Sequence, residues 1–243
     1  MLELKNICFS AEEDGVKKDI LKDINLTIDE RFVAITGPNG GGKSTLIKVI
    51  AGVLKPTSGR ILLDGEDITD LSITDRARKG ISYAFQQPVR FKGITVYDLI
   101  TLASGRQLTI SEACEYLSEV GMCARDYVNR EVNASLSGGE LKRIEIATIL
   151  ARATKLSLFD EPEAGIDLWS FGSLITVFEN LYEKIKGNII IISHQERILN
   201  IADRIIVLGG GRVINDGTRD EVFPTLVDTA GICARLSNEG GLC

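Results

Sequence analysis

The sequence has no long apolar run. Nowhere in its 243 residues does an apolar stretch approach the ~20 residues that a helix needs to cross a bilayer. The first ten residues, MLELKNICFS, also lack the apolar segment of a secretory signal. We therefore expect a cytoplasmic chain, which would lie at the periphery of a membrane only if a partner held it there.

Cysteine and positive charge are both scarce. The five cysteines, Cys8, Cys114, Cys123, Cys233 and Cys243, are odd in number and form no C-x-x-C pair. This pattern predicts reduced thiols instead of a disulfide framework or a metal centre. The 28 basic residues are outnumbered by 34 acidic ones, which argues against a protein that binds nucleic acid.

The apolar pattern that is present predicts an α/β fold. Alternating residues in 2–9 and 20–29 indicate antiparallel strands joined by a loop at 15–19. Further strands are expected at 32–36, 60–65, 81–85, 155–160 and 188–193, with a hairpin at 202–216; helices are expected at 43–54, 95–103, 110–121, 140–153 and 173–185. Strands that alternate with helices imply a mostly parallel sheet.

Between residues 88 and 133 the pattern contains helices and no strand. We therefore predict one domain over 1–243, with a core formed by 1–87 and 134–243 and an inserted helical subdomain at 88–133. The N-terminal strands are expected to form an antiparallel β subdomain beside the parallel sheet.

A glycine-rich loop after the strand at 32–36 predicts a phosphate-binding site. The segment GPNGGGKST matches G-x-x-x-x-G-K-S and opens directly into a helix. Glycines let backbone N–H groups converge on phosphates, and the helix N-terminus adds positive potential. The predicted nucleotide-binding residues are Gly37, Pro38, Asn39, Gly40, Gly41, Gly42, Lys43, Ser44 and Thr45. Lys43 is expected at the β- and γ-phosphates and Ser44 at Mg²⁺.

The loop alone does not separate an ATPase from a GTPase or a small-molecule kinase. The strand LSLFD supplies more, because it ends in a carboxylate that can hold Mg²⁺, Asp160. The next residue, Glu161, can act as the general base. We predict Ser44, Gln86 and Asp160 as the metal ligands. Gln86 is also expected to sense the γ-phosphate and move the helical insertion.

The single histidine, His194, follows the strand at 188–193. A histidine there can be a structural hydrogen-bonding group, but a strand ending near Asp160 favours contact with the γ-phosphate. We therefore predict Glu161, His194 and Gln86 as the catalytic residues.

A second glycine-containing segment, LSGGE, lies at 136–140. Ser137, Gly138 and Gly139 precede a long helix, which makes another helix N-terminus suited to an anion. Since the first loop already surrounds its own phosphates, the second is useful facing a nucleotide held by another copy of the chain. This predicts an ATP-dependent homodimer that encloses two ATPs, with Asp167 near the interface.

These segments together resemble the ABC ATPases. GPNGGGKST, AFQQP, LSGGE, LSLFDEP, GID and SH occur in the order and spacing of that family's Walker A, Q-loop, signature, Walker B, D-loop and H-loop. The resemblance covers almost the whole chain. It implies a dimer that closes on ATP, opens after hydrolysis and thereby drives a partner.

The surroundings of these motifs are most similar to the Suf-system iron–sulfur cluster assembly ATPase, SufC. AFQQPV, LSGGELKR, EAGID and SHQERIL carry this resemblance. Transporter subunits usually place an aromatic side chain that stacks on adenine after the first strand, where this chain has Ala11. SufC-like chains tend to lack this aromatic. Phe9 either takes the place of the stacking aromatic or belongs to the core. The resemblance implies a SufB-like scaffold as partner, and the alternative is the ATP-binding subunit of a membrane transporter with a separate transmembrane permease.

Overall fold

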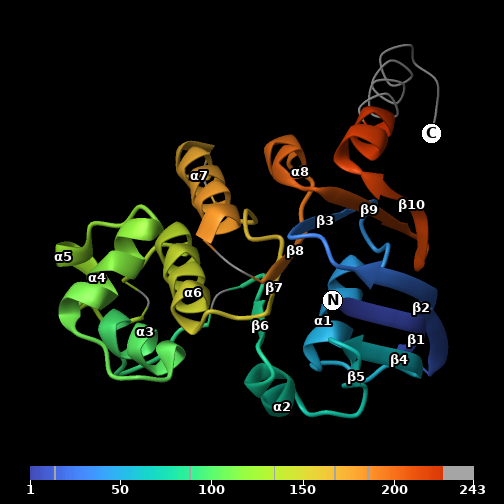
Figure 1. Ribbon diagram of the computed structural model, residues 1–243, viewed down its shortest axis with the longest axis horizontal. Coiled ribbons are helices and arrows are strands. Elements are labelled where there is room, and N and C mark those ends of the chain that lie inside the picture. The colour runs from blue at the N-terminus through green and yellow to red at the C-terminus, as the bar shows by residue number, and fades with distance from the viewer. Residues whose placement is uncertain (14, 88, 134, 167, 185–186, 227–243) are drawn as a thin grey trace.

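A six-stranded sheet forms the centre of the protein (Figure 1). The structure is a computed structural model that describes residues 1–226 except 14, 88, 134, 167, 185 and 186. The strands run in the order β10-β9-β3-β8-β7-β6, and all but β10 are parallel to their neighbours. Their bounds are β3 Phe32–Thr36, β6 Ile81–Ala84, β7 Leu156–Asp160, β8 Asn188–Ile192, β9 Arg204–Gly209 and β10 Arg212–Thr218. The mostly parallel sheet is therefore confirmed.

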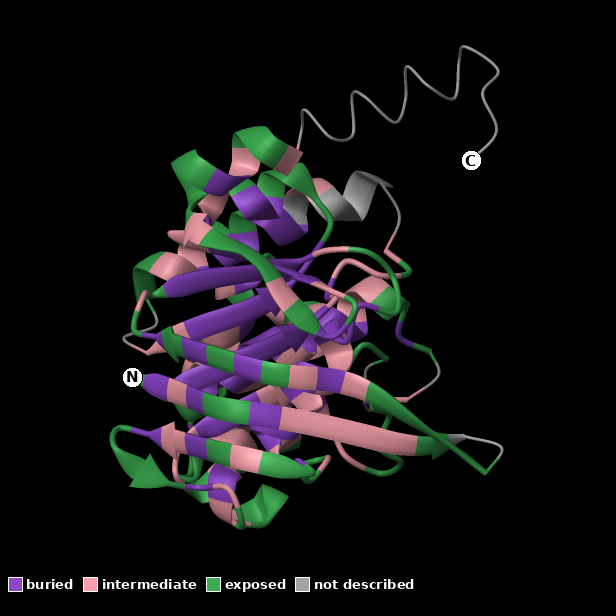
Figure 2. Ribbon diagram, turned by 90° about the vertical axis from the view of Figure 1, so that its right-hand side faces the viewer, coloured by how far each residue is buried: buried purple, intermediate pink, exposed green. Residues whose placement is uncertain are grey.

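The N-terminal strands form a separate antiparallel sheet of order β2-β1-β4-β5. Their bounds are β1 Leu2–Glu13, β2 Val16–Ile28, β4 Ser58–Leu63 and β5 Glu66–Asp67. Figure 2 shows the long strands of this sheet alternating between buried and exposed residues, as a half-buried strand should. The loop predicted at 15–19 is wrong, because Val16 to Asp19 pair with β1 and only the turn around Gly15 separates the strands.

Helices cover the parallel sheet and build the insertion. Their bounds are α1 Lys43–Ala51, α2 Ile73–Arg78, α3 Val96–Ser104, α4 Ile110–Glu119, α5 Ala124–Tyr127, α6 Gly138–Arg152, α7 Leu168–Lys184 and α8 Glu196–Ile201. The sequence pattern missed α2 and α8, each of six residues, which are too short to show a helical period. In the part of the chain that the structure describes, no helix is both long enough and apolar enough to cross a membrane.

Each face of the parallel sheet buries its own apolar core. On β3, Phe32 and Ala34 pack with the helices α3, α4, α6 and α7, whereas Val33 and Ile35 pack with α1 and the antiparallel sheet. The alternation along one strand thus divides the protein into two packed layers. The insertion α3–α5 joins the first core through α6, which packs on α3 and α4. The boundary of the helical subdomain at 133 stays a prediction.

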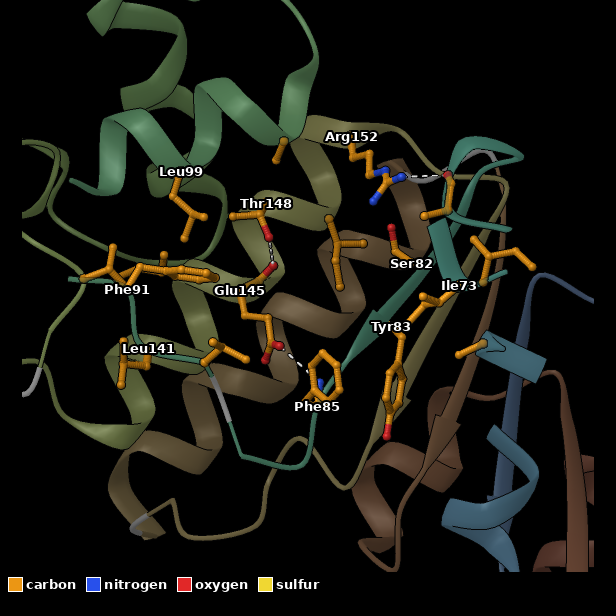
Figure 3. A pocket seen from close by; sticks show the side chains of 18 residues that line it. Ile73, Ser82, Tyr83, Phe85, Phe91, Leu99, Leu141, Glu145, Thr148 and Arg152 are labelled. Atoms are coloured by element: carbon orange, nitrogen blue, oxygen red, sulfur yellow. Dashed lines mark hydrogen bonds between the residues drawn. The ribbon is translucent and has the colours of Figure 1, made fainter. Parts of the chain in front are cut away.

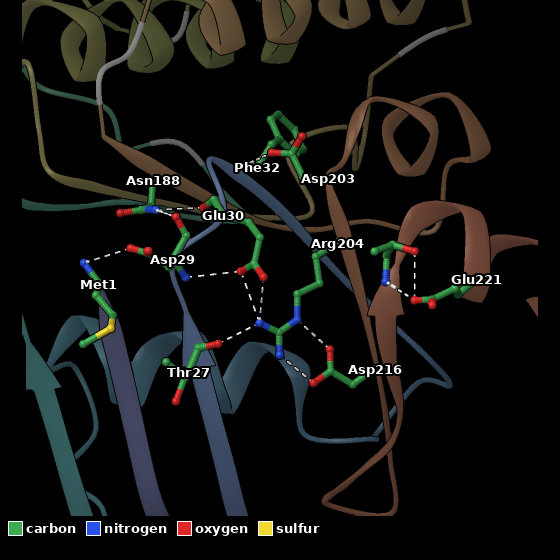
Figure 4. A network of polar contacts seen from close by, with 11 residues as sticks. Met1, Thr27, Asp29, Glu30, Phe32, Asn188, Asp203, Arg204, Asp216 and Glu221 are labelled. Carbon is green, nitrogen blue, oxygen red and sulfur yellow. Dashed lines mark hydrogen bonds and ion pairs between the residues drawn. The ribbon is translucent and has the colours of Figure 1, made fainter.

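A half-buried arginine ties the two sheets together (Figure 4). Arg204 on β9 makes a two-pronged ion pair with Asp216 of β10 at 2.6 and 2.7 Å. It also donates to the Thr27 carbonyl of β2 at 2.7 Å and to Glu30 at 3.1 Å. The hydrogen bonds that Arg204 donates to Asp216 hold the pKa of the guanidinium above its ordinary value despite burial. These contacts fix the β9–β10 hairpin, whose turn borders the glycine-rich loop, against the antiparallel sheet.

Candidate functional site

The glycine-rich loop joins β3 to α1, as its motif predicts. Three of its glycines have positive φ: Gly37 at 129°, Gly40 at 75° and Gly42 at 98°. A Cβ on Gly37 would lie 2.1 Å from the carbonyl oxygen of Leu208, so this position admits only glycine. The loop therefore depends on glycine both for its backbone angles and for its close packing on β9.

Lys43 is the first residue of α1 and lies across this loop. Its ammonium donates to the carbonyl oxygens of Gly37 at 2.7 Å and Pro38 at 3.0 Å. Burial lowers the pKa of Lys43, and the charges of Glu161 and Asp160 act in the opposite direction. The cation is thus held within the loop, at the place where phosphate oxygens would converge.

Asp160 ends β7 beside the N-terminus of α1. The residue is 1% exposed. Its Oδ1 accepts a hydrogen bond from Ser44 Oγ at 2.8 Å, and its Oδ2 accepts one from Tyr83 OH at 3.1 Å. A serine hydroxyl and a carboxylate in contact at a phosphate loop are the oxygen ligands that a nucleotide-carried Mg²⁺ uses.

The two oxygen donors, Ser44 and Asp160, suit such an ion. Among the described residues, no three His, Cys, Asp or Glu side chains gather to hold a metal. Mg²⁺ keeps waters and substrate phosphates as ligands and needs only one or two groups from the protein. Ser44 and Asp160 fit this need. Gln86 contacts the Glu161 carboxylate instead of Asp160, and its role as a metal ligand stays a prediction.

Glu161 lies one residue beyond Asp160, where the chain leaves β7. Its backbone takes the left-handed conformation, φ 47°, and its N–H donates to the Ile192 carbonyl at 3.1 Å. Such strain in a non-glycine residue is typical of functional sites. The side chain accepts a hydrogen bond from Gln86 Nε2 at 2.8 Å, and His194 Nε2 lies 3.9 Å from its Oε1.

His194 lies where its surroundings disfavour the charged imidazolium. Burial lowers its pKa, as does the charge of Lys43, while Glu161 opposes them. A neutral imidazole can both donate and accept a hydrogen bond. The three predicted catalytic residues, Glu161, His194 and Gln86, therefore come together at one end of the parallel sheet.

A hollow of about 480 Å³ surrounds the loop. Its lining includes Asn39 to Thr45, Glu161, Ala11 and Ile20 of the β1–β2 hairpin, and the turn Gly210–Gly211. No described lining residue is aromatic. Phe9 packs against the core between the sheets, so of the two interpretations the core role holds, and Ala11 stands where an adenine-stacking side chain is usual in transporter subunits.

The segment LSGGE, predicted to bind a second anion, lies at the start of α6. Ser137 caps the helix by accepting from the Glu140 N–H at 3.2 Å, and Glu140 accepts in return from the Ser137 N–H at 2.7 Å. No described residue of 135–140 lines the hollow around the first loop. Figure 1 shows α6 and α1 on opposite sides of β6 and β7. Asp167, predicted near the interface, lies outside the described residues.

Two further residues contact the site and were missed from the sequence. Tyr83 of β6 binds Asp160, as described above. Lys142 of α6 is 4% exposed and donates to the carbonyl oxygens of Glu161 at 3.2 Å and Ala164 at 2.9 Å. Lys142 thereby joins the helix of the second anion-binding segment to the backbone that carries Glu161. The only sequence signal for Tyr83 was its position on the strand predicted at 81–85.

A second hollow, of about 300 Å³, lies between β6, α2 and the helices α3 and α6 (Figure 3). We call it the groove; its apolar lining includes Tyr83, Phe85, Phe91 and Leu99. Glu145 of α6 points into it and accepts a hydrogen bond from the Phe85 N–H at 3.1 Å. Burial raises the pKa of Glu145 to about 7.

The sequence profile described as ABC transporter matches residues 21–164, more than half of the chain. This chain belongs to the ABC transporter ATPase family. An uncharacterized ABC transporter ATP-binding protein of Methanocaldococcus jannaschii is 40% identical over 92% of both chains. The energy-coupling factor transporter ATP-binding protein EcfA1 of Ligilactobacillus salivarius is 35% identical over 92% of this chain and 79% of its own.

Solved structures agree with this membership. A dimeric ATP-binding cassette in a post-hydrolysis state, bound to ADP and Pi, superposes with a TM-score of 0.79 and 27% identity, over 90% of this chain and 99% of the other. The predicted fold, a P-loop ABC ATPase with an antiparallel N-terminal sheet and a helical insertion, is confirmed. The protein is an ATP hydrolase of this family. The relatives are named as transporter subunits, so the narrower resemblance to SufC is not shown.

The first prediction concerns the general base. Glu161→Gln keeps the shape and the hydrogen bond to Gln86 but cannot take a proton from water, so ATP turnover should fall by at least ~10²-fold. ATP affinity, measured by calorimetry, should be retained. Glu179→Gln, on the exposed face of α7, is the matched control and should keep normal turnover; near-normal turnover in the Glu161 variant would contradict the assignment.

The second prediction concerns pH and Glu145. The pKa of this carboxyl rises from its usual 4.5 to about 7 on folding, so between these values the folded protein binds more protons than the unfolded chain. Its contribution to stability is therefore full below pH 4.5 and lost as pH rises toward 7, by an amount of up to about 3 kcal/mol.

Glu145→Gln keeps the acceptor for the Phe85 N–H and removes the titration. Urea unfolding at pH 5 and pH 8 should show that the variant gains stability relative to the wild type at the higher pH. An equal difference between the two proteins at both pH values would show that Glu145 is not held protonated.

Proposed function

We propose that this chain is the ATP-binding subunit of a transporter complex, a Mg²⁺-dependent ATPase that dimerises around two nucleotides and moves a transmembrane permease. The observation that carries the ATPase part is the meeting of Lys43, Ser44, Asp160 and Glu161 at one end of the parallel sheet. The names of the relatives support the transporter part. As such a subunit, the chain would be peripheral to the cytoplasmic face of the membrane.

The residues divide the work of hydrolysis between them. Lys43 would exchange its contacts with Gly37 and Pro38 for β- and γ-phosphate oxygens, while the loop N–H groups hold the phosphate chain. Ser44 and Asp160 would hold Mg²⁺, which neutralises charge that develops on the phosphates. Glu161 would accept the proton of the attacking water, with Gln86 fixing its carboxylate.

His194 completes the γ-phosphate side of the site. A neutral imidazole at this position would donate a hydrogen bond to a phosphate oxygen without attracting the proton that Glu161 must take. Glu161 and His194 follow the neighbouring strands β7 and β8. The left-handed backbone of Glu161 and the hydrogen bond from its N–H to the Ile192 carbonyl of β8 fix this arrangement.

A homodimer follows from the position of the second anion-binding segment. Ser137, Gly138 and Gly139 begin α6 at a distance from the chain's own loop, across β6 and β7. The N–H groups of a helix start favour an anion. In a two-fold dimer, this segment would close over the nucleotide of the other copy, with Asp167 beside it. The dimeric state of the similar ADP-bound cassette supports this arrangement.

A second candidate partner is a SufB-like scaffold for iron–sulfur cluster assembly. One observation favours it: Ala11 lines the nucleotide hollow where a transporter subunit usually carries an aromatic, and Phe9 belongs to the core. Under this hypothesis the chain hydrolyses ATP in the same way, and only its partner protein differs. No nucleic acid is expected in either case.

Purification of the tagged chain from its native cells with mild detergent distinguishes the two proposed partners. If a polytopic membrane protein is recovered in stoichiometric amount and the purified complex hydrolyses ATP, the result supports the transporter function. Recovery of a soluble scaffold from the membrane-free fraction supports the SufC-like alternative and overturns the permease. A chain that does not hydrolyse ATP would overturn both.

The third prediction tests the dimer. Ser137→Arg places a bulky side chain at the proposed interface, so it should prevent ATP-dependent dimerisation in a Glu161→Gln background, while each monomer still binds ATP through its own loop. Light scattering coupled to size exclusion measures the dimer, and calorimetry measures ATP binding. Loss of a helix cap costs about 1 kcal/mol, too little to unfold the chain.

Thr109→Arg is the matched control, because Thr109 caps α4 with the same pair of hydrogen bonds. This variant should dimerise normally. A dimer that survives Ser137→Arg would refute the trans arrangement, and a monomer that loses ATP binding would place the segment on its own chain's nucleotide.

A further inference from the structure

The segment from Tyr83 to Gln86 contacts the carboxylates of Asp160 and Glu161 and also lines the groove. Tyr83 OH donates to Asp160, and Gln86 Nε2 donates to Glu161. Between them, Phe85 lines the groove and gives its N–H to Glu145. One short segment at the end of β6 therefore connects the ATPase site to the groove by two separate routes.

The Tyr83 route has a defined geometry at the metal-holding end. Asp160 Oδ1 accepts from Ser44 and Oδ2 from Tyr83, so each carboxylate oxygen is fixed by a different element. Ser44 is itself a predicted metal ligand, so its hydroxyl is shared between the ion and Asp160. The Tyr83 hydroxyl is not a predicted metal ligand, so it acts on Asp160 alone.

At the other end, the Tyr83 ring lies against the groove. Its centroid is 4.6 Å from that of Phe85, with the planes tilted by 55°. Offset and tilted aromatic pairs at this separation attract each other. Phe85 is 39% exposed, whereas the Tyr83 hydroxyl reaches buried Asp160. Figure 3 shows the Phe85 and Tyr83 rings side by side. A shift of the Phe85 ring at the surface would therefore displace the hydroxyl that holds the carboxylate of Asp160.

We propose that Tyr83 is a positioning residue for Asp160, and that its ring, resting on Phe85, makes Mg²⁺ binding at the ATPase site sensitive to the groove. The inference rests on the proposed function, since it needs Asp160 to hold the metal. It adds a route from groove to metal that is distinct from the contact of Gln86 with the base.

The test compares binding of the non-hydrolysable nucleotide β,γ-imido-ATP with Mg²⁺ and with EDTA, so that turnover plays no part. The ratio of the two dissociation constants measures how much the metal tightens binding. Tyr83→Phe keeps the ring and removes one hydrogen bond to a charged group, so the ratio should fall by about tenfold or more. The affinity in EDTA should not change. Phe85→Leu should lower the ratio in the same direction by a smaller factor.

Ser82→Ala is the matched control. Ser82 precedes Tyr83 on β6 and is 5% exposed, and its hydroxyl has no hydrogen-bond partner among the described residues. This variant loses a buried hydroxyl without touching Asp160, so its ratio should equal that of the wild type.

The positioning role of Tyr83 and its link to the groove can fail separately. An unchanged ratio in Tyr83→Phe would refute the positioning role, and an equal loss of affinity with Mg²⁺ and with EDTA would show a structural role instead. An unchanged ratio in Phe85→Leu would refute the link to the groove. A wild-type protein that binds no nucleotide, or binds it without any help from Mg²⁺, would instead overturn the proposed function.

Discussion

The site depends on the carboxylate of Asp160 more than on any other group. It sits at the end of a fully buried strand, and its two oxygens accept hydrogen bonds from α1 and from β6. Because the carboxyl ends of parallel strands meet at one edge of a sheet, the same edge also carries the glycine-rich loop after β3 and His194 after β8. Ser44 and Asp160 lie 116 positions apart in the sequence, yet the sheet order brings them into contact. The motif residues are therefore effective only because the sheet has this order.

Much of this arrangement could be predicted from the sequence, because the relevant signals are local. The loop Gly37 to Thr45 follows an apolar strand and opens a helix, and both neighbours are required by its geometry. Strands such as β7 and β8 read as continuous apolar runs since both of their faces are buried. The Ser137 cap was likewise predictable, because Glu140 three residues later forms the second half of a capping box.

What the sequence could not supply depends on pairing between distant elements. Tyr83 contacts Asp160 because β6 pairs with β7, and no local pattern distinguishes that tyrosine from one that packs in a core. Arg76 is similar: it reads as a charged surface residue but is 1% exposed and donates to the last carbonyls of α1 at Val49 and Ile50. The length of the β1–β2 hairpin was predicted wrongly because its sequence lacks the pattern of a half-buried strand. The run Val16 to Asp19 is mostly polar and resembles a loop, but these strands extend past the core, where both faces meet solvent and alternation is lost.

In the proposed dimer, the start of α6 would complete the nucleotide site of the other copy. The capping box satisfies the N–H groups of Ser137 and Glu140 within the chain. A helix cannot satisfy its own first N–H groups, so those of Gly138 and Gly139 are left for an acceptor from outside. Glycine at both positions allows a large anion to approach the backbone closely. Lys142, on the same helix, binds the carbonyl of Glu161. An anion that docks on Gly138 would therefore contact the helix whose Lys142 binds the backbone of Glu161, the proposed general base. In the proposed dimer, this contact would link the nucleotide of one copy to hydrolysis in the other.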